Sequence, residues 1–329
     1  MALFGLITIP PANFKLMLMK LFARFRSFLA VCLLPALTAC AQPTPATVSP
    51  TAGILPAASP YGYARVIRAI PYLSHPTARQ NFDLYLPGNP GRRPFPLVVW
   101  IHGGAWLSGD KDWNNVKYLV RHGYALASVD YRFSTEARFP AQIQDCNAAM
   151  NFILAHATNY GVDPRRFVVA GGSAGGHLAL LLGFTRTNAE FGADPAIKPL
   201  AVLDFFGPTD FDHMLDDLTT IHSESGLHLL HDAGPKLLGE PVDQPSERAK
   251  NASPITYVNT ACPPVLILQG GRDELVPARQ SRRLQSALGQ AGVKNQLILI
   301  EAAGHDGPLF GTPEVEAGVV DFLNGILMK

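Results

Sequence analysis

Short apolar runs alternate with helical patterns along most of the chain, and this alternation constrains the fold more than any other feature. The helical patterns occupy residues 115–121, 141–155, 174–184, 278–291 and 314–327. Continuous runs rich in Val, Ile and Leu are typical of strands that are buried on both faces of a sheet. The predicted strands are residues 97–101, 125–129, 167–170, 201–205, 265–269 and 296–300. A repeated strand–helix unit predicts an α/β fold with a mostly parallel central sheet flanked by helices.

Three segments depart from this alternation. Residues 64–69 and 82–86 have strand character and flank a turn at His75-Pro76, so they predict an antiparallel opening to the sheet. Residues 208–258, between the sixth and seventh predicted strands, mix short helical pieces with turns. An insertion at that point would overhang the carboxyl ends of the strands, and we expect it to act as a lid. No linker divides the chain after Tyr61, so residues 61–329 are expected to form one catalytic domain.

Composition excludes several classes of protein. The 329 residues are 47% hydrophobic, which suffices for a large core and excludes a disordered chain. Lys and Arg number 27 against 26 Asp and Glu, so no diffuse positive field is available to bind nucleic acid. Four cysteines are too few for a disulfide scaffold. A globular protein of enzyme size remains.

The amino-terminal region has the order of a secretory signal. The apolar run 28–37 is too short to cross a bilayer as a permanent helix, and basic residues precede it: Lys15, Lys20, Arg24 and Arg26. We expect residues 1–39 to be a signal peptide. Residues 40–60, rich in Pro, Ala and Thr, are expected to be a flexible tether.

The predicted signal ends in Leu37-Thr38-Ala39-Cys40, which resembles the lipobox of bacterial lipoproteins. The resemblance implies acylation of Cys40 and a lipid-anchored protein of the bacterial envelope, without any other membrane contact. Ordinary cleavage after Ala39 or Ala41, giving a periplasmic or secreted protein, is the alternative. Cys146 and Cys262 would remain in the mature chain. Export permits them to form a disulfide, and their apolar surroundings suit two separate buried thiols equally well.

A nucleophile is predicted where the third parallel strand ends. The strand 167–170 is followed by Gly171-Gly172-Ser173-Ala174-Gly175, which opens the helix 174–184. This is the G-x-S-x-G pattern in the strand–turn–helix context that it requires. Glycines permit a tight turn that exposes the hydroxyl of Ser173 at a helix amino end. The alternative is a glycine-rich turn with a capping serine.

An oxyanion hole is predicted after the strand 97–101, where the chain reads His102-Gly103-Gly104-Ala105-Trp106. Small residues allow amide N–H groups to turn toward a developing oxyanion, and we expect the donors to be Gly103, Gly104 and Ala174. His102 lies within this glycine loop and is interpreted as a structural brace. Trp106 is either a wall of an acyl pocket or part of the core.

Two further strand ends supply an acid and a base. Asp273 follows the strand 265–269, and His305 follows the strand 296–300. The chain order Ser173, Asp273, His305 is the order of an α/β-hydrolase triad. His305 would take the proton from the serine, and Asp273 would orient the imidazole ring. The rival carboxylates, Glu274 and Asp306, are less suitably placed.

Residues from about 61 to 327 resemble the α/β-hydrolase esterases, near the carboxylesterase and hormone-sensitive-lipase-like branch. The resemblance is carried by Ser128-Val129-Asp130-Tyr131-Arg132, by Phe139-Pro140-Ala141-Gln142 and by Asp145. The segments 204–210, 252–254 and 273–277 are similar to bacterial feruloyl and acetyl-xylan esterases. Two residues depart from the family pattern. Many relatives carry an acidic residue where this chain has Gly172, and a third glycine where it has Ala105. The alanine at position 105 favours smaller acyl groups.

These observations predict a serine esterase without a cofactor that forms an acyl-enzyme on Ser173. The resemblance implies small or aromatic acyl groups, such as acetyl or feruloyl esters, on small molecules or plant polysaccharide. The alternatives are an amide-directed hydrolase with the same triad and a catalytically inactive scaffold on the envelope. No metal is expected, because His222, His228 and His231 have no carboxylate or cysteine at a convincing spacing.

Overall fold

A computed structural model describes residues 7–9, 52–53, 61–88 and 93–328 of the chain. Apart from two short strands, the predicted signal peptide, the tether and Cys40 lie outside the described residues. A ten-stranded sheet has the order β1-β10-β9-β8-β7-β5-β6-β4-β3-β2. The strands are β1 (Ile7–Ile9), β2 (Ala52–Gly53), β3 (Tyr63–Pro71), β4 (Asn81–Pro87), β5 (Phe95–Ile101), β6 (Ala125–Val129), β7 (Val162–Gly172), β8 (Val202–Phe205), β9 (Val265–Gly270) and β10 (Asn295–Ile300).

The sheet is parallel from β1 through β10, β9, β8, β7 and β5 to β6. It is antiparallel from β6 through β4 and β3 to β2. The antiparallel opening and the mostly parallel sheet are therefore confirmed. The parallel strands β5, β6, β8 and β9 are buried along their whole length, as their continuous apolar runs predict.

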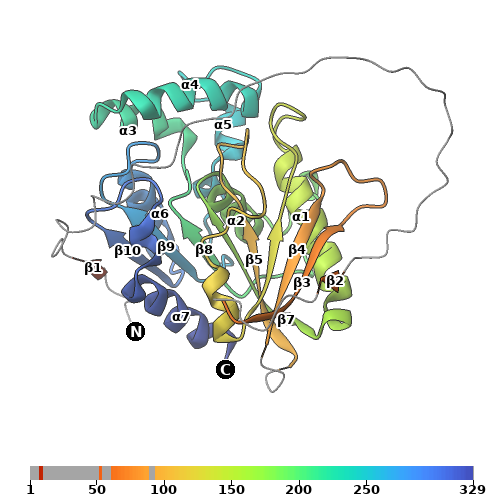
Figure 1. Ribbon diagram of the computed structural model, residues 1–329. Helices are drawn as coiled ribbons and strands as arrows, with labels where there is room; N and C mark the ends of the chain where they lie inside the picture. Colours follow the sequence, from red (N-terminus) through yellow and green to blue (C-terminus); the bar gives the residue numbers. More distant parts are fainter. Residues whose placement is uncertain (1–6, 10–51, 54–60, 89–92, 329) are drawn as a thin grey trace, which may run out of the picture.

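Helices cover both faces of the sheet (Figure 1), and the side chains of its central strands alternate between two cores. Leu97 and Val99 of β5 lie in one core with residues of α1, α2 and α6, whereas Val98 and Trp100 lie in the other core with residues of α7. These helices are α1 (Ala141–His156), α2 (Ala174–Phe184), α6 (Ala278–Gln290) and α7 (Pro313–Leu327). No helix in the described part of the chain is both long and apolar enough to span a bilayer.

The insertion between β8 and β9 lies over one end of the sheet, as Figure 1 shows. It contains α3 (Met214–Thr220), α4 (Glu224–Leu238) and α5 (Glu247–Ala252). This end is formed by the carboxyl ends of the parallel strands, where β7 leads into α2. That this insertion is a lid over the site stays a prediction.

Two predicted boundaries are wrong. The segment 115–121 is a 3₁₀-helix, Lys117–His122, and it ends at Gly123 in a left-handed conformation (φ 92°). A six-residue piece between two strands is too short to gain from the cooperativity of a longer α-helix. The strand β7 begins at Val162, before the predicted residue 167, because Phe95 pairs with Val162 across a register shift. Pro164, which cannot donate to a ladder, conceals this extension in the sequence.

Candidate active site

Ser173 lies on a strained turn between β7 and α2. Its φ is 56° and its ψ is −122°, a conformation that few residues other than glycine adopt. A Cβ atom on Gly171 would lie 2.2 Å from the Gly175 carbonyl oxygen, and one on Gly175 would lie 2.0 Å from the Ile101 carbonyl oxygen. The two glycines are therefore required because the backbone passes too close for any side chain.

Ser173, His305 and Asp273 form a continuous hydrogen-bonded chain. The Ser173 Oγ atom lies 2.9 Å from His305 Nε2, and His305 Nδ1 lies 2.8 Å from Asp273 Oδ2. Since the carboxylate can only accept, Nδ1 donates to Asp273 and Nε2 is left to accept the serine proton. The structure thus brings together three residues that come from the ends of β7, β9 and β10.

The carboxylate of Asp273 is buried and held from three directions. Its Oδ1 atom accepts hydrogen bonds from the amides of Leu275 (2.9 Å) and Val276 (2.8 Å). Its Oδ2 atom accepts one from the side-chain amide of Gln269 (3.0 Å). Gln269 is itself fixed, because its Oε1 atom accepts a hydrogen bond from Ser281 (2.7 Å). The carboxylate therefore faces His305 with little rotational freedom.

The glycine loop after β5 lies directly against the nucleophile. A Cβ atom on Gly103 would lie 3.2 Å from the Cβ of Ser173, and Gly104 has a φ of 106°. Within the described part of the structure, the amides of Gly104 and Ala174 donate to no carbonyl or side chain. Unpaired amides near a serine hydroxyl are what an oxyanion requires.

The buried side chain of His102 holds this loop in place. It is fully buried, its Nδ1–H donates to the Gly103 carbonyl oxygen (2.7 Å), and its ring stacks on Tyr131 at 4.5 Å. Burial lowers the pKa of His102, so the ring is neutral. A ring that is enclosed in this way suits the structural role expected from the sequence.

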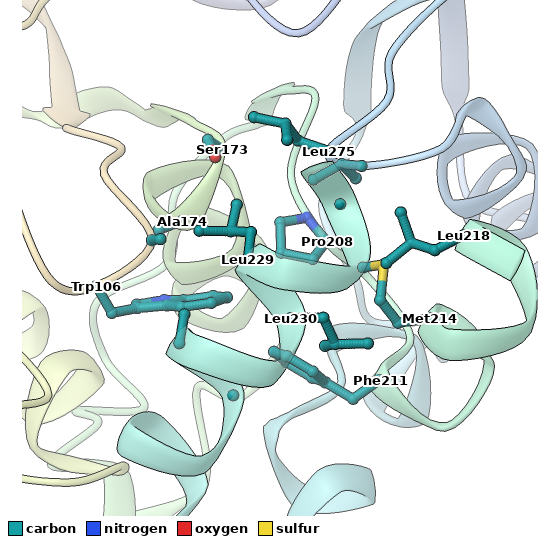
Figure 2. A pocket seen from close by; sticks show the side chains of 15 residues that line it. Trp106, Ser173, Ala174, Pro208, Phe211, Met214, Leu218, Leu229, Leu230 and Leu275 are labelled. Atoms are coloured by element: carbon teal, nitrogen blue, oxygen red, sulfur yellow. The ribbon is translucent and has the colours of Figure 1, made fainter. Parts of the chain in front are cut away.

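A narrow apolar cavity begins at Ser173 and runs beneath α4 (Figure 2). The space open to the centre of a water molecule is about 40 Å³. Its lining combines the glycine loop, the start of α2, the insertion and the segment after Asp273. The lining residues are Ala105, Trp106, Ser173, Ala174, Pro208, Phe211, Met214, Leu218, Gly226, Leu229, Leu230, Ala233, Gly234, Leu275 and Val276. Ser173 supplies the one hydroxyl group of this lining, and the indole of Trp106 is its other hydrogen-bonding side chain.

Trp106 is a wall of the cavity and part of the core at once. Its indole N–H donates to His177 Nδ1 (3.3 Å), and its ring packs 5.8 Å from that of Phe211. The Nε2–H of His177 donates to the carbonyl oxygen of Ala252 (2.7 Å), at the end of α5. Burial lowers the pKa of His177 to about 4, so this imidazole is neutral and links the cavity wall to the insertion.

Comparison with protein families gives a match over most of the described chain. Residues 82–288 match the family model BD-FAE. The chain belongs to the BD-FAE family. The α/β-hydrolase fold that the sequence resemblance implied is thereby confirmed.

Among curated proteins, this BD-FAE chain is similar to two esterases of Mycobacterium tuberculosis. It is 32% identical to Esterase LipQ over 70% of this chain and 54% of LipQ, and 29% identical to Esterase LipC over 69% and 56%. The chain thus spans about half the length of these relatives. A solved structure, a truncated carbohydrate esterase from gut microbiota, superposes with a TM-score of 0.71 at 27% identity, over 82% of this chain and 99% of that one.

The rival carboxylates of this BD-FAE protein do not reach His305. Glu274 is exposed, and its side chain lies 3.5 Å from Ser225 Oγ. Asp306 accepts a hydrogen bond from the side chain of Asn115 (2.9 Å). Among the described residues, no cluster of three His, Cys, Asp or Glu side chains is arranged to hold a metal.

The two body cysteines are separate thiols. Cys146 is buried and Cys262 is half-buried, and neither forms a disulfide. Burial raises the pKa of both thiols. The disulfide that the sequence left open is therefore not formed.

Sequence reasoning missed two residues that hold the triad. Gln269 orients Asp273, and the ring of Phe206 packs 4.8 Å from the ring of His305. A signal for Gln269 was present, since it ends an otherwise apolar buried strand and a buried amide needs partners. Phe206 has no such signal, because an aromatic residue after a strand is common in any core.

Proposed function

We propose that this BD-FAE protein is a serine carboxylic-ester hydrolase that forms an acyl-enzyme on Ser173. The observation that carries the proposal is the hydrogen-bonded chain from Ser173 through His305 to Asp273, at 2.9 Å and 2.8 Å. Esterase activity in the similar proteins LipC and LipQ supports it. No part of the reaction requires a cofactor.

In the first half of the reaction, Ser173 Oγ attacks the ester carbonyl carbon while its proton passes to His305 Nε2. The carbonyl oxygen becomes an oxyanion that the amides of Gly104 and Ala174 stabilise, with Gly103 as the further expected donor. Asp273 stabilises the imidazolium through Nδ1–H. The intermediate collapses, the bond to the alcohol oxygen breaks, and His305 returns the proton to that oxygen.

In the second half, a water molecule takes the place of the alcohol. His305 accepts a proton from this water as its oxygen attacks the acyl carbon, and a second oxyanion forms in the same position. Collapse of that intermediate breaks the bond to Ser173 Oγ, and His305 returns the proton to the serine. The carboxylic acid leaves, and the free enzyme is restored.

The test is hydrolysis of p-nitrophenyl acetate by the wild-type protein and by Ser173→Ala. We expect the substitution to lower kcat by about 10⁴-fold or more, because the covalent route is removed. Fluorophosphonate labelling of the wild type, and its loss in Ser173→Ala, would separate a catalytic serine from a binding scaffold. Equal turnover by the two proteins would reject the mechanism, and faster cleavage of a matched p-nitroanilide would favour an amide-directed enzyme.

We further propose that the natural substrates are small acyl esters carried on carbohydrate. A carbohydrate esterase is among the similar structures, and the sequence resembles acetyl-xylan and feruloyl esterases. Release of acetate from acetylated xylan, compared with release from p-nitrophenyl acetate, tests this proposal.

Export and a lipid anchor on Cys40 are also proposed, from the lipobox-like sequence alone. Metabolic labelling with a clickable palmitate analogue in a bacterial host is expected to mark the wild type and not Cys40→Ser. Equal labelling of the two proteins would contradict acylation at Cys40.

A further inference from the structure

We infer that α4 closes the acyl pocket at a fixed depth and that Leu229 limits the acyl group to short chains. This inference rests on the proposed esterase function and names the substrate class of the same site. It excludes the aromatic acyl groups that the sequence resemblance left open.

The cavity beneath α4 lies on the acyl side of the nucleophile. Its lining includes Ser173, Ala174 and Ala105, which adjoin the expected oxyanion position, and does not include His305. The leaving alcohol must receive its proton from His305, so it departs on the side of that ring. The part of the substrate that stays on Ser173 after this step is the acyl group, and the cavity is the space left for it.

The size of the cavity sets the length of the acyl chain. The space open to the centre of a water molecule is only about 40 Å³, so the cavity suits a short acyl chain. A feruloyl ring is far larger, and its phenolic oxygens would find no partner in the lining besides Ser173, since the indole N–H of Trp106 already donates to His177.

Side-chain contacts from α3 attach the insertion to α6. Asp217 of α3 is buried and pairs with both terminal nitrogens of Arg283, each at 3.0 Å. It also accepts a hydrogen bond from the side chain of Gln280 (2.8 Å). Arg283 and Gln280 both belong to α6, so α3 is attached to one of the helices that cover the sheet.

A second attachment lies at the beginning of α4, where the helix contacts the segment after Asp273. Ser223 is the N-cap of α4, where its Oγ atom accepts the Gly226 amide (3.0 Å) and donates to the Glu274 carbonyl oxygen (2.6 Å). Gly226 packs so closely there that an added Cβ would lie 2.3 Å from that carbonyl. Because these two attachments hold α4 in place, the helix does not move away from Ser173 to admit a longer acyl chain.

Leu229 occupies the position on α4 that faces the nucleophile. Figure 2 shows its side chain directed into the space between Ser173, Ala174 and Pro208, whereas Leu230 and Phe211 lie farther along the cavity. Leu229 is half-buried and packs against the core. Shortening this side chain therefore lengthens the pocket along the direction that an acyl chain follows.

The experiment measures kcat/KM for p-nitrophenyl acetate, butyrate, hexanoate and octanoate. In the wild type, we expect a fall of at least tenfold from butyrate to octanoate. In Leu229→Ala, the octanoate-to-butyrate ratio should rise at least tenfold, because each additional buried methylene contributes about fourfold and at least two are admitted. Leu229→Phe should act in the opposite direction and lower the butyrate-to-acetate ratio about tenfold, so the inference stays testable if the alanine variant folds poorly.

Leu227→Ala is the matched control. Leu227 is a half-buried leucine of the same helix that does not line the cavity, so its ratios should match those of the wild type within about twofold. Wild-type activity on octanoate or a feruloyl ester equal to that on butyrate would overturn the inference, as would unchanged ratios in both Leu229 variants. In those cases, Ser173-dependent acetate hydrolysis would leave the proposed function standing. A wild type that hydrolyses no ester and takes no fluorophosphonate label would reject both.

Discussion

The free energy of unfolding of the wild-type protein should fall as the pH rises above neutral. Replacement of Asp204 by Asn should remove this fall. Asp204 lies at the carboxyl end of β8, paired in register with Gly171 of β7, and it is completely buried. Its Oδ1 atom accepts the amide of Gly207 (2.9 Å), and its Oδ2 atom has no partner within the described residues. Burial raises the pKa of Asp204 to about 8, so the folded protein holds this carboxyl protonated at neutral pH.

The size of the effect follows from the protons bound in each state. Between the unfolded pKa of 3.8 and the folded pKa of about 8, the folded state holds a proton that the unfolded state has lost. The free energy of unfolding therefore falls by about 1.4 kcal/mol per pH unit as the pH rises. His177 has the opposite effect, since its pKa is lowered from 6.5 to about 4 and its contribution is lost as the pH falls through that window. Above pH 6.5 the effect of Asp204 is no longer opposed, and from pH 6.5 to 8 it amounts to about 1.6 kcal/mol, because the carboxyl is half ionised at its folded pKa of about 8.

Urea unfolding at pH 6.5 and pH 8.0 measures this difference. We expect the wild type to lose about 1.6 kcal/mol across the interval relative to Asp204→Asn, since the amide keeps the shape of the side chain and does not titrate. Asp216→Asn, at an exposed position on α3, is the matched control and should follow the wild type. Parallel stability curves for the wild type and Asp204→Asn would refute the reasoning, because they would mean that Asp204 binds no extra proton in the folded state.

Two further substitutions test the supports of the site. Gln269→Leu removes the side-chain donor to Asp273 Oδ2 and should lower kcat on p-nitrophenyl acetate about tenfold with little change in KM; an unchanged kcat would show that the backbone amides suffice. Asp217→Ala leaves Arg283 without its buried partner and should lower the free energy of unfolding in urea by about 2–3 kcal/mol, less than for a fully enclosed pair because Arg283 is 28% exposed. A loss below about 0.5 kcal/mol would contradict the anchoring of α3.

The predictable part of the fold comes from the strands. Runs such as 97–101 and 265–269 are apolar along their whole length, and burial on both faces leaves them few alternatives to a parallel sheet. Because the carboxyl ends of parallel strands meet at one edge, the positions of Ser173, Asp273 and His305 just after three strands were enough to predict their convergence. The distance along the chain does not obscure this convergence, although His305 comes 132 positions after Ser173.

The cavity was not predictable in the same way. Its walls come from the glycine loop, the start of α2, α4 and the segment after Asp273, and its depth depends on where α4 lies above them. That placement is decided by the attachments of Asp217 and Ser223, which are polar residues in a segment without strong periodicity. The sequence indicates that an insertion overhangs the site, but nothing in the sequence gives the distance between α4 and Ser173.

The N-cap of α4 has a consequence for engineering. Ser223 binds the carbonyl of Glu274, the residue that follows Asp273, so the helix that we propose limits chain length also holds the segment that carries the proposed acid. Variants that widen the pocket by shifting α4 as a whole would loosen the acid as well, and broader acyl range would then be accompanied by slower turnover. Truncations of single side chains that leave the first turn of the helix intact avoid this trade-off.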